Sequence, residues 1–243
     1  MDRYMIVLAI DTCEVRGGVS ILSDETVIHT IVHRTVEEYS SWLLPAVDAL
    51  LRAGTKTMRD VDLYAVSAGP GSFTGVRIGL TTVKAWSEVF GRPIAAVSRL
   101  EVLAAESPCD ALYTVSFVNA QRGQIFGAVY KRSGDVLNLL GQEMVAAPED
   151  FIAWVAEQAG TERVAWVSTD PSIVAEQPAW KIRMARAEEI LSVPCVLAPM
   201  IGRRGFQKAL QGNVLDALSL DANYVRRSDA EIFWRCSPHA AAR

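Results

Sequence analysis

The chain has 243 residues, half of them hydrophobic, and a formal net charge of −4. That is enough apolar material for one large domain or two small ones. So small a charge argues against a strongly basic nucleic-acid-binding surface. No apolar run reaches the roughly 20 residues that a membrane span requires.

The cysteines and the N-terminus both indicate a cytoplasmic protein. The run Met5–Ile10 is short and ends at Asp11 without a small-residue cleavage site, which favours a first β-strand over a signal peptide. The cysteines form no Cys-x-x-Cys pair, and a chain of this length folds without disulfides, so we expect reduced thiols. The cysteines are Cys13, Cys109, Cys195 and Cys236.

The first third of the chain predicts three strands with short links, which form an antiparallel meander, followed by strand–helix alternation. This alternation predicts parallel strand pairing with right-handed crossovers. The predicted strands are Tyr4–Thr12, Gly17–Leu22, Val27–Arg34, Val61–Ser67 and Ile94–Val97.

Two helices are predicted in this part. The first covers "SSWLLPAVDALLRAG", with Ser40 or Ser41 as its cap and Pro45 in its first turn. The second follows "GPGSFTG", is capped by Ser72 or Thr74, and runs to about Phe90. Its apolar stripe of Val76, Leu80, Val83 and Phe90 is expected to face the sheet.

The second half repeats this order about a hundred residues later. "LYTVSFVNAQRGQIFGAVYKR" predicts strand, tight turn and strand, with Asn119 in the place of Asp11. Two similar halves side by side are one interpretation. The later elements are a strand at Leu137–Val145, a helix at Pro148–Ala159, a strand at Arg163–Ser168, a short strand after Val193, a helix at Met200–Leu210 and an extended tail.

The histidine pair in "HTIVH" does not predict a metal site. His29 and His33 have the spacing that binds zinc on a helix, but the segment is predicted to be a strand. On a strand the two side chains stand roughly 13 Å apart, too far for one ion.

Two segments are candidates for phosphate binding. "GPGSFTGVRIG" has no lysine after its last glycine, and its glycine spacing is one residue too long for a dinucleotide fingerprint. The turn after the first strand contains Asp11 and Thr12, as phosphate hairpins do in actin-like ATPases and sugar kinases. Asn119 at the second position lacks the same charge, so a complete ATPase site is not predicted.

The glycines of the second helix suggest another role. Gly75 and Gly79 are four residues apart and share a face, with Thr82 nearby. Each glycine costs a helix roughly 1 kcal/mol relative to alanine, which points to a compensating contact. We expect this small-residue face to admit a second helix.

A set of specific segments spans most of the chain. They are "LAIDTCE", "SSWLLPAVDALL", "GPGSFTGVRIGLTTVKAW", "PIAAVSRLEVLA", "VNAQRGQIFGAVY" and "NYVRRSDAE". In these segments, and above all in "GPGSFTGVRIG", the chain resembles the TsaB family, also called YeaZ. The chain departs from the family where His-Ser-Glu is usual, with Tyr39-Ser40-Ser41, and where Asp-Ala-Arg is usual, with Asn119-Ala120-Gln121.

The resemblance implies an α/β, two-lobed actin/hexokinase-like (ribonuclease H-like) fold, each lobe a mixed sheet with helices. Residues 1–98 would form the first lobe, completed by about 196–226, and residues 99–195 the second. The chain would be a non-catalytic scaffold, in a complex that transfers threonylcarbamoyl from its adenylate to N6 of adenosine 37 in tRNAs reading ANN codons.

The implied partners are a TsaD-like catalytic subunit, a TsaE-like ATPase and, through the complex, tRNA. ATP or ADP and a metal are expected in those subunits, and none in this chain. Alone, the chain would form homodimers through the same helices. The expected partner interface comprises Trp42, Leu43, Val47, Leu50, Ser72, Phe73, Thr74, Gly75, Arg77, Gly79 and Thr82.

Two other functions stay open. The Asp11/Thr12 hairpin is compatible with a free-standing actin-like ATPase or small-molecule kinase. A protease ranks last, because neither a metal pair nor a catalytic triad is evident.

Overall fold

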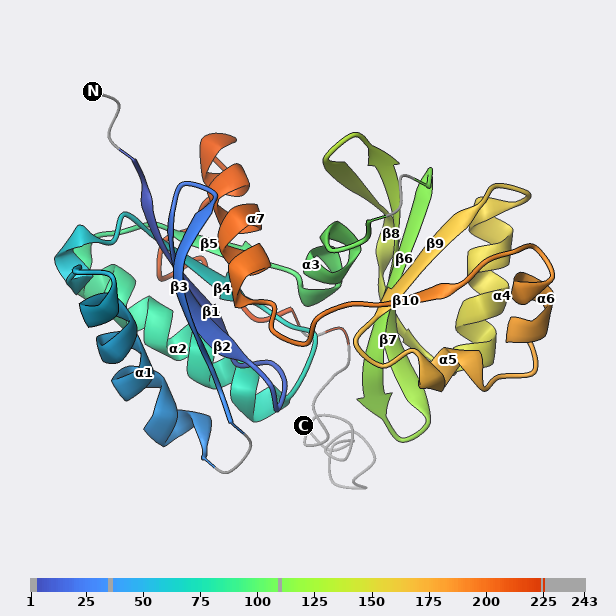
Figure 1. The fold of residues 1–243 in the computed structure, drawn as a ribbon, viewed down its shortest axis with the longest axis horizontal. Helices are drawn as coiled ribbons and strands as arrows, with labels where there is room; N and C mark the ends of the chain where they lie inside the picture. The colour runs from blue at the N-terminus through green and yellow to red at the C-terminus, as the bar shows by residue number, and fades with distance from the viewer. Residues whose placement is uncertain (1–3, 35–36, 109–110, 224, 226–243) are drawn as a thin grey trace, which may run out of the picture.

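The computed structural model describes residues 4–34, 37–108, 111–223 and 225. Cys109, Cys236 and most of "NYVRRSDAE" lie outside these ranges. Two lobes stand side by side, each built on a five-stranded sheet (Figure 1). Among the described residues, every helix is too short or too polar to cross a membrane.

The first lobe contains the predicted meander and crossovers. Its strands are ordered β3-β2-β1-β4-β5; β1 to β3 pair antiparallel, and β4 and β5 join parallel to β1. The elements are β1 (Ile6–Asp11), β2 (Gly18–Ser23), β3 (Thr26–Val32), α1 (Tyr39–Ala53), η1 (Met58–Asp60), β4 (Leu63–Ser67), α2 (Phe73–Phe90) and β5 (Ile94–Val97).

The second lobe repeats this topology, which confirms the predicted repeat. Read from its other edge, its strand order is β8-β7-β6-β9-β10, the counterpart of the first sheet. Two short helices replace α2, and the short strand lies just before Val193 rather than after it. The elements are β6 (Tyr113–Gln121), β7 (Gln124–Ser133), β8 (Val136–Ala146), α4 (Pro148–Ala159), β9 (Val164–Ser168), α5 (Ser172–Ala175), α6 (Trp180–Met184) and β10 (Ile190–Ser192).

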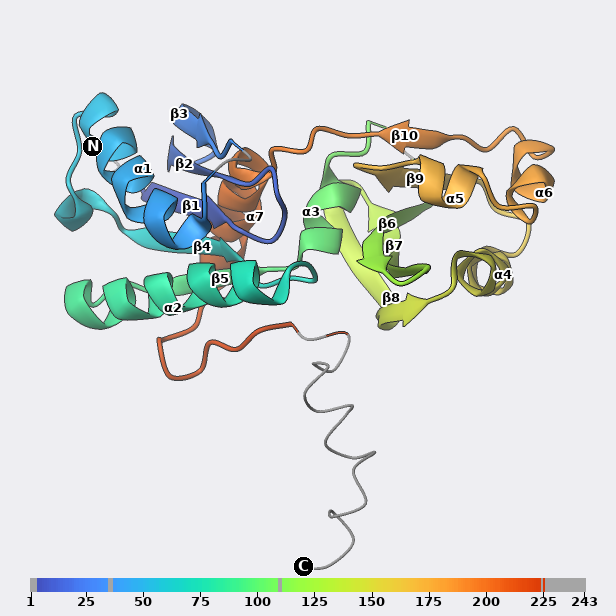
Figure 2. The same cartoon turned by 90° about the horizontal axis from the view of Figure 1, so that it is seen from below.

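Two further helices connect the lobes. α7 (Ala198–Leu210) covers the face of the first sheet opposite α1 and α2, and α3 (Arg99–Ala105) lies between α7 and the second sheet (Figure 2). One apolar cluster continues from the first sheet through α3 and α7 into β6 and β7. α3 was not predicted.

Alternate side chains of the first sheet separate its two cores. Leu8 and Ile10 of β1 pack with α1 and α2, whereas Val7 and Ala9 pack toward α7 and α3. The predicted stripe of α2 is largely confirmed, because its first three members are buried and Phe90 is half-buried.

The predicted start of α1 is wrong. The helix begins at Tyr39, with Glu38 as an N-cap that makes no side-chain capping bond. The Ser41 hydroxyl instead donates to the Glu38 carbonyl. Pro45 consequently lies inside the helix, where it removes one backbone donor. Gly54 ends the helix as expected.

Candidate functional site

The turn between β1 and β2 packs directly on the first turn of α2. The Thr12 hydroxyl is buried and donates to the Gly75 carbonyl at 2.6 Å. The Ser72 amide donates to the Cys13 carbonyl at 2.8 Å. Ser72 is the N-cap of α2, as predicted, and its Oγ accepts from the Gly75 amide at 3.3 Å.

The glycines of α2 do not admit a second helix, so that part of the predicted interface is wrong. A methyl group at Gly75 would overlap the Thr12 carbonyl oxygen. At Gly79 it would lie 2.6 Å from Thr12 Oγ1. The small-residue face therefore accommodates the chain's own β1–β2 turn, and both glycines are buried.

The predicted apolar stripe of α1 is also wrong as a partner surface. Leu43, Val47 and Leu50 are buried in the first lobe's own core. The outer face of α1 instead presents Leu44, which is 57% exposed. The helical period predicts an apolar face, and here that face packs on the sheet.

Part of the predicted interface does lie at the surface. Ser72, Phe73, Thr74 and Arg77 are exposed at the start of α2, and the Arg77 guanidinium lies 3.8 Å from the Phe73 ring centroid. The half-buried remainder is Trp42 and Thr82.

The predicted phosphate hairpin is filled by side chains of this chain. The Tyr39 hydroxyl donates to the Glu14 carbonyl and accepts from the Gly17 amide at 2.7 Å. The Thr12 hydroxyl is committed to α2. Two donors of this hairpin, the Gly17 amide and the Thr12 hydroxyl, are thus already bonded within the chain.

Asp11 is fully buried beneath this turn. Its Oδ1 accepts from the Cys13 amide at 3.0 Å, whereas Oδ2 has no hydrogen-bond partner among the described residues. Burial raises the pKa of Asp11, and the Arg99 guanidinium opposes this only in part. Arg99 is itself buried and donates to Glu14 Oε1 at 2.8 Å.

Asn119 makes the same local turn in the second lobe. Its Oδ1 accepts from the Gln121 amide at 2.7 Å, two residues ahead, as Asp11 does from Cys13. Asp11 ends β1, and Asn119 lies two residues before the end of β6. The two positions are structural counterparts, as predicted, and the second carries no charge.

The chain's other potentially reactive groups include the Cys13 thiol and two histidines. Burial raises the pKa of the Cys13 thiol to about 12, so this cysteine stays protonated. His29 is exposed, whereas His33 is buried. Within the described ranges, no three histidine, cysteine or acidic side chains cluster as metal ligands would.

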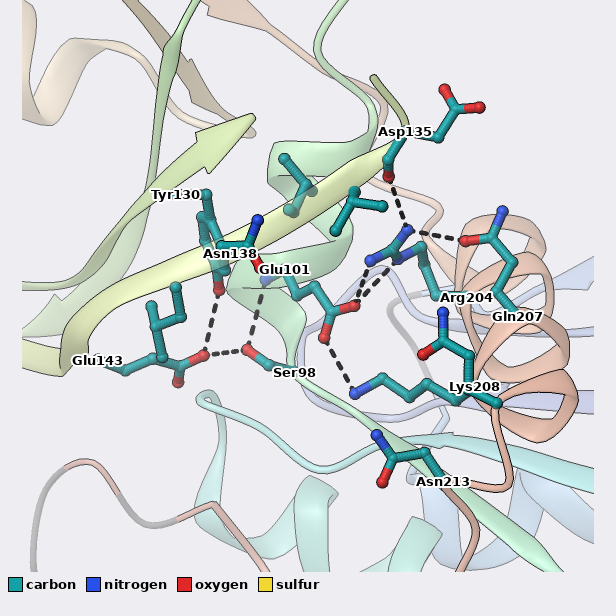
Figure 3. A pocket seen from close by; sticks show the side chains of 14 residues that line it. Ser98, Glu101, Tyr130, Asp135, Asn138, Glu143, Arg204, Gln207, Lys208 and Asn213 are labelled. Carbon is teal, nitrogen blue, oxygen red and sulfur yellow. Dashed lines mark hydrogen bonds and ion pairs between the residues drawn. The ribbon is translucent and has the colours of Figure 1, made fainter. Parts of the chain in front are cut away.

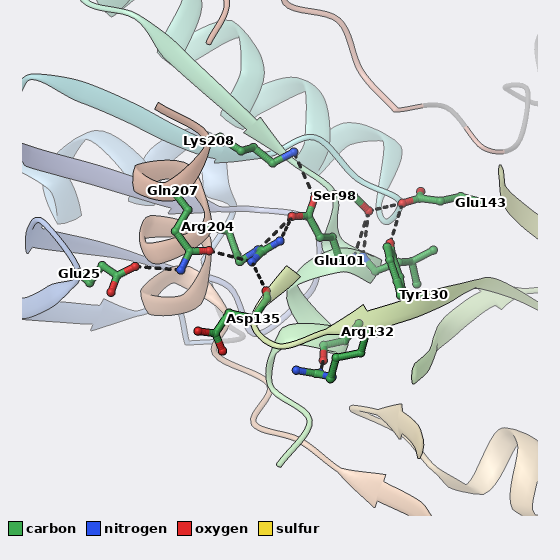
Figure 4. Close-up of polar contacts among 12 residues, drawn as sticks. Glu25, Ser98, Glu101, Tyr130, Arg132, Asp135, Glu143, Arg204, Gln207 and Lys208 are labelled. Carbon is green, nitrogen blue, oxygen red and sulfur yellow. Dashed lines mark hydrogen bonds and ion pairs between the residues drawn. The ribbon is translucent and has the colours of Figure 1, made fainter. Parts of the chain in front are cut away.

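A pocket of about 470 Å³ lies between the lobes, and no sequence pattern predicted it. α3, α7, β7 and β8 line it (Figure 3). On one side, Arg204 of α7 pairs with Glu101 of α3 at 2.7 Å, and Lys208 pairs with the same carboxylate at 3.2 Å. Arg204 also donates to the Asp135 carbonyl, in the turn before β8 (Figure 4).

The other side of the pocket holds Glu143 of β8. Ser98, the N-cap of α3, donates to Glu143 Oε1, and so does Tyr130 at 3.4 Å. Asn223, beyond α7, donates to Glu143 Oε2 at 2.6 Å. Burial raises the pKa of Glu143. Both carboxylates are saturated by partners of this chain, so this arrangement suits a link between the lobes.

Comparison with known families gives a match over residues 27–178 to the family described as "TsaD: tRNA N6-adenosine threonylcarbamoyltransferase". The chain is similar to the Bacillus subtilis tRNA threonylcarbamoyladenosine biosynthesis protein TsaB. The two are 34% identical over 155 residues, which cover 63% of this chain and 67% of that protein. The Escherichia coli protein of the same name is 31% identical over 130 residues, covering 53% and 56%.

Solved structures share the fold. YeaZ from Pseudomonas aeruginosa superposes with a TM-score of 0.68 at 24% identity, covering 90% of this chain and 99% of that one. A second Pseudomonas aeruginosa protein, described as similar to peptidase YEAZ, gives a TM-score of 0.72 at 23% identity, covering 91% and 100%. The predicted two-lobed α/β fold is confirmed.

The contact between α2 and the β1–β2 turn is testable with one methyl group. Gly75→Ala is expected to lower the free energy of unfolding by at least about 3 kcal/mol, because the new methyl overlaps a backbone oxygen. Thr74→Ala, at the exposed neighbouring position, is expected to change it by less than about 0.5 kcal/mol. Urea denaturation measures both, and equal effects would contradict the packing.

Asp11 predicts a specific pH dependence of stability. A carboxyl whose pKa is raised on folding contributes stability below the ordinary aspartate pKa, and this contribution is lost as pH rises through the raised value. Asp11→Asn keeps the acceptor for the Cys13 amide, as Asn119 does, and removes the titration. The variant is expected to gain stability relative to the native chain as pH rises through that window. Parallel stability curves in urea titrations from acid to neutral pH would refute the assignment.

Proposed function

The chain belongs to the TsaB (YeaZ) family, and we propose that it is a non-catalytic scaffold subunit in tRNA threonylcarbamoyladenosine synthesis. The complex would transfer threonylcarbamoyl from its adenylate to N6 of adenosine 37 in tRNAs reading ANN codons. The observation that supports the non-catalytic role is the internal bonding of the hairpin: the Gly17 amide donates to the Tyr39 hydroxyl, and the Thr12 hydroxyl donates to the Gly75 carbonyl. The proposed location of this modification reaction is the cytoplasm.

The proposed partner is a TsaD-like catalytic subunit, homologous to this chain. A TsaE-like ATPase would join the complex, tRNA would bind through the assembly, and the nucleotide and metal would be held by these other subunits. The family match to a TsaD model over more than half of the chain supports a related partner.

The proposed docking surface is the outer face of α1 and α2. It combines the exposed Leu44 with the Phe73–Arg77 pair at the start of α2. Exposed apolar side chains beside a cation are typical of interface centres. In the absence of the partner, the same face would support homodimers at high concentration.

The alternative is a free-standing actin-like ATPase or kinase. Calorimetry on the isolated chain with ATP and Mg²⁺ distinguishes the two, and we expect no micromolar binding because the Gly17 amide and the Thr12 hydroxyl are bonded internally. Micromolar binding with turnover would favour the enzyme.

A single charged substitution tests whether this surface binds the partner. Leu44→Asp is expected to weaken binding to the TsaD-like subunit about tenfold or more, because it places an unpaired carboxylate in an apolar contact. The matched control is Ile182→Asp on α6 of the second lobe, where the native side chain is 68% exposed. Co-purification and the threonylcarbamoyladenosine content of tRNA from complemented cells are the measurements. Equal binding by both variants would exclude this face.

A further inference from the structure

His33 follows β3 and is only 5% exposed. Its ring lies between two backbone segments, the β1–β2 turn and the residues that precede α1. Nδ1 lies 2.9 Å from the Val15 carbonyl oxygen, and Nε2 lies 2.7 Å from the Glu37 carbonyl oxygen. Both ring nitrogens are therefore at hydrogen-bond distance from a group that only accepts.

A neutral imidazole satisfies one of these contacts and not the other. It carries one N–H, and its second nitrogen would direct a lone pair at a carbonyl oxygen. The imidazolium carries two N–H groups and satisfies both. Because the ring is buried, an unmade hydrogen bond here is costly. The geometry thus selects the doubly protonated ring.

The aromatic neighbours suit a cation. The His33 ring stacks on the Tyr39 ring, with centroids 4.1 Å apart and planes inclined by 28°. An aromatic face attracts a positive charge held above it. The Trp42 ring meets His33 at 5.0 Å in an edge arrangement.

Tyr39 and His33 hold the same turn. The Tyr39 hydroxyl bonds Glu14 and Gly17, on either side of the Val15 carbonyl that His33 contacts. The His33 amide also donates to the Gly17 carbonyl at 3.0 Å. The β1–β2 turn is consequently fastened to the start of α1 by the imidazole, the phenol and the backbone together.

We propose that His33 is a protonation-dependent clamp, which as an imidazolium ties the β1–β2 turn to the start of α1 and releases one of its two carbonyls on losing a proton. The clamp operates on the isolated chain and does not rest on the proposed function. When it opens, the Tyr39 hydroxyl and the Gly17 amide lose the support of the ring.

The charged groups around the ring are balanced. The turn carries Glu14, which pairs with the buried Arg99, and the exposed Arg16. Exposed Arg34 follows the ring, and exposed Glu37 and Glu38 precede α1. Positions 35 and 36 are threonine and valine, which do not titrate.

Burial shifts the pKa of two further groups in this region. Burial raises the pKa of Tyr39 above its ordinary range, so the phenol stays neutral at physiological pH. Burial also raises the pKa of Asp11, and this carboxyl is present in both the native chain and His33→Gln. The part of the pH dependence that His33→Gln removes therefore belongs to His33.

Nitrogen NMR of the imidazole rings in the unmodified chain tests the protonation directly. The chain has three histidines, His29, His33 and His239, and loss of one signal in His33→Gln assigns the ring. At neutral pH we expect both His33 nitrogens to carry protons. A neutral tautomer of His33 at neutral pH would overturn the proposal.

Unfolding measured across pH tests the consequence. His33→Gln retains one side-chain hydrogen-bond donor group, the amide, and does not titrate. The matched control is His29→Gln, at an exposed position of β3. Relative to His33→Gln, the unfolding constant of the native chain is expected to increase with pH, by up to tenfold per unit across the titration. His29→Gln should follow the native chain. If the ratio of the unfolding constants of the native chain and His33→Gln stayed the same at all pH values, the clamp would be refuted.

Hydrogen exchange at the Gly17 amide locates the effect. This amide donates to Tyr39, so its protection, corrected for intrinsic exchange, should fall as His33 loses its proton. Unchanged protection across the titration would contradict the release of the turn. The exchange and NMR measurements use the native chain. They therefore test the proposal even if His33→Gln does not fold.

Discussion

The architecture of the first lobe depends on the close approach of α2 to the end of β1. Thr12 fits against Gly75 and Gly79, and its hydroxyl bonds the helix backbone. A side chain at either glycine position would overlap Thr12 and prevent this contact. Since Ser72 and Cys13 join the same two segments, the start of α2 is fixed relative to the sheet, and with it the outer face that Phe73 occupies.

The same contact uses the side chains of the turn that follows β1. In the turn after β1, the threonine hydroxyl points to α2 and Tyr39 fills the loop. Tyr39 is the residue at which the chain departs from the family's usual histidine. At this position the Tyr39 hydroxyl bonds the turn, and the His33 ring stacks on the Tyr39 ring.

Local sequence patterns predicted most of the fold, but they did not predict which distant segments pack against one another. Strand alternation and the Ser72 cap depend on neighbouring residues, and the repeat, the cap and the strands other than the short one predicted after Val193 are confirmed. The segment that packs on the glycine face of α2 is distant in the sequence, so local spacing does not identify it. The small residues alone suggested that a second helix packs there. α3 did have a signal, Ser98 followed by Glu101 in the manner of a capping box. The pocket unites segments from three parts of the chain, so spacing does not reveal it.

The links around the interlobe pocket have a mechanical consequence. Arg204 and Asn223, which follow the second lobe in the chain, bond Glu101 of α3 and Glu143 of β8. Rotation of one lobe against the other at this pocket would separate both carboxylates from their partners. The two lobes should therefore move together as one rigid unit, so that a partner bound to α1 and α2 also fixes the orientation of the second lobe.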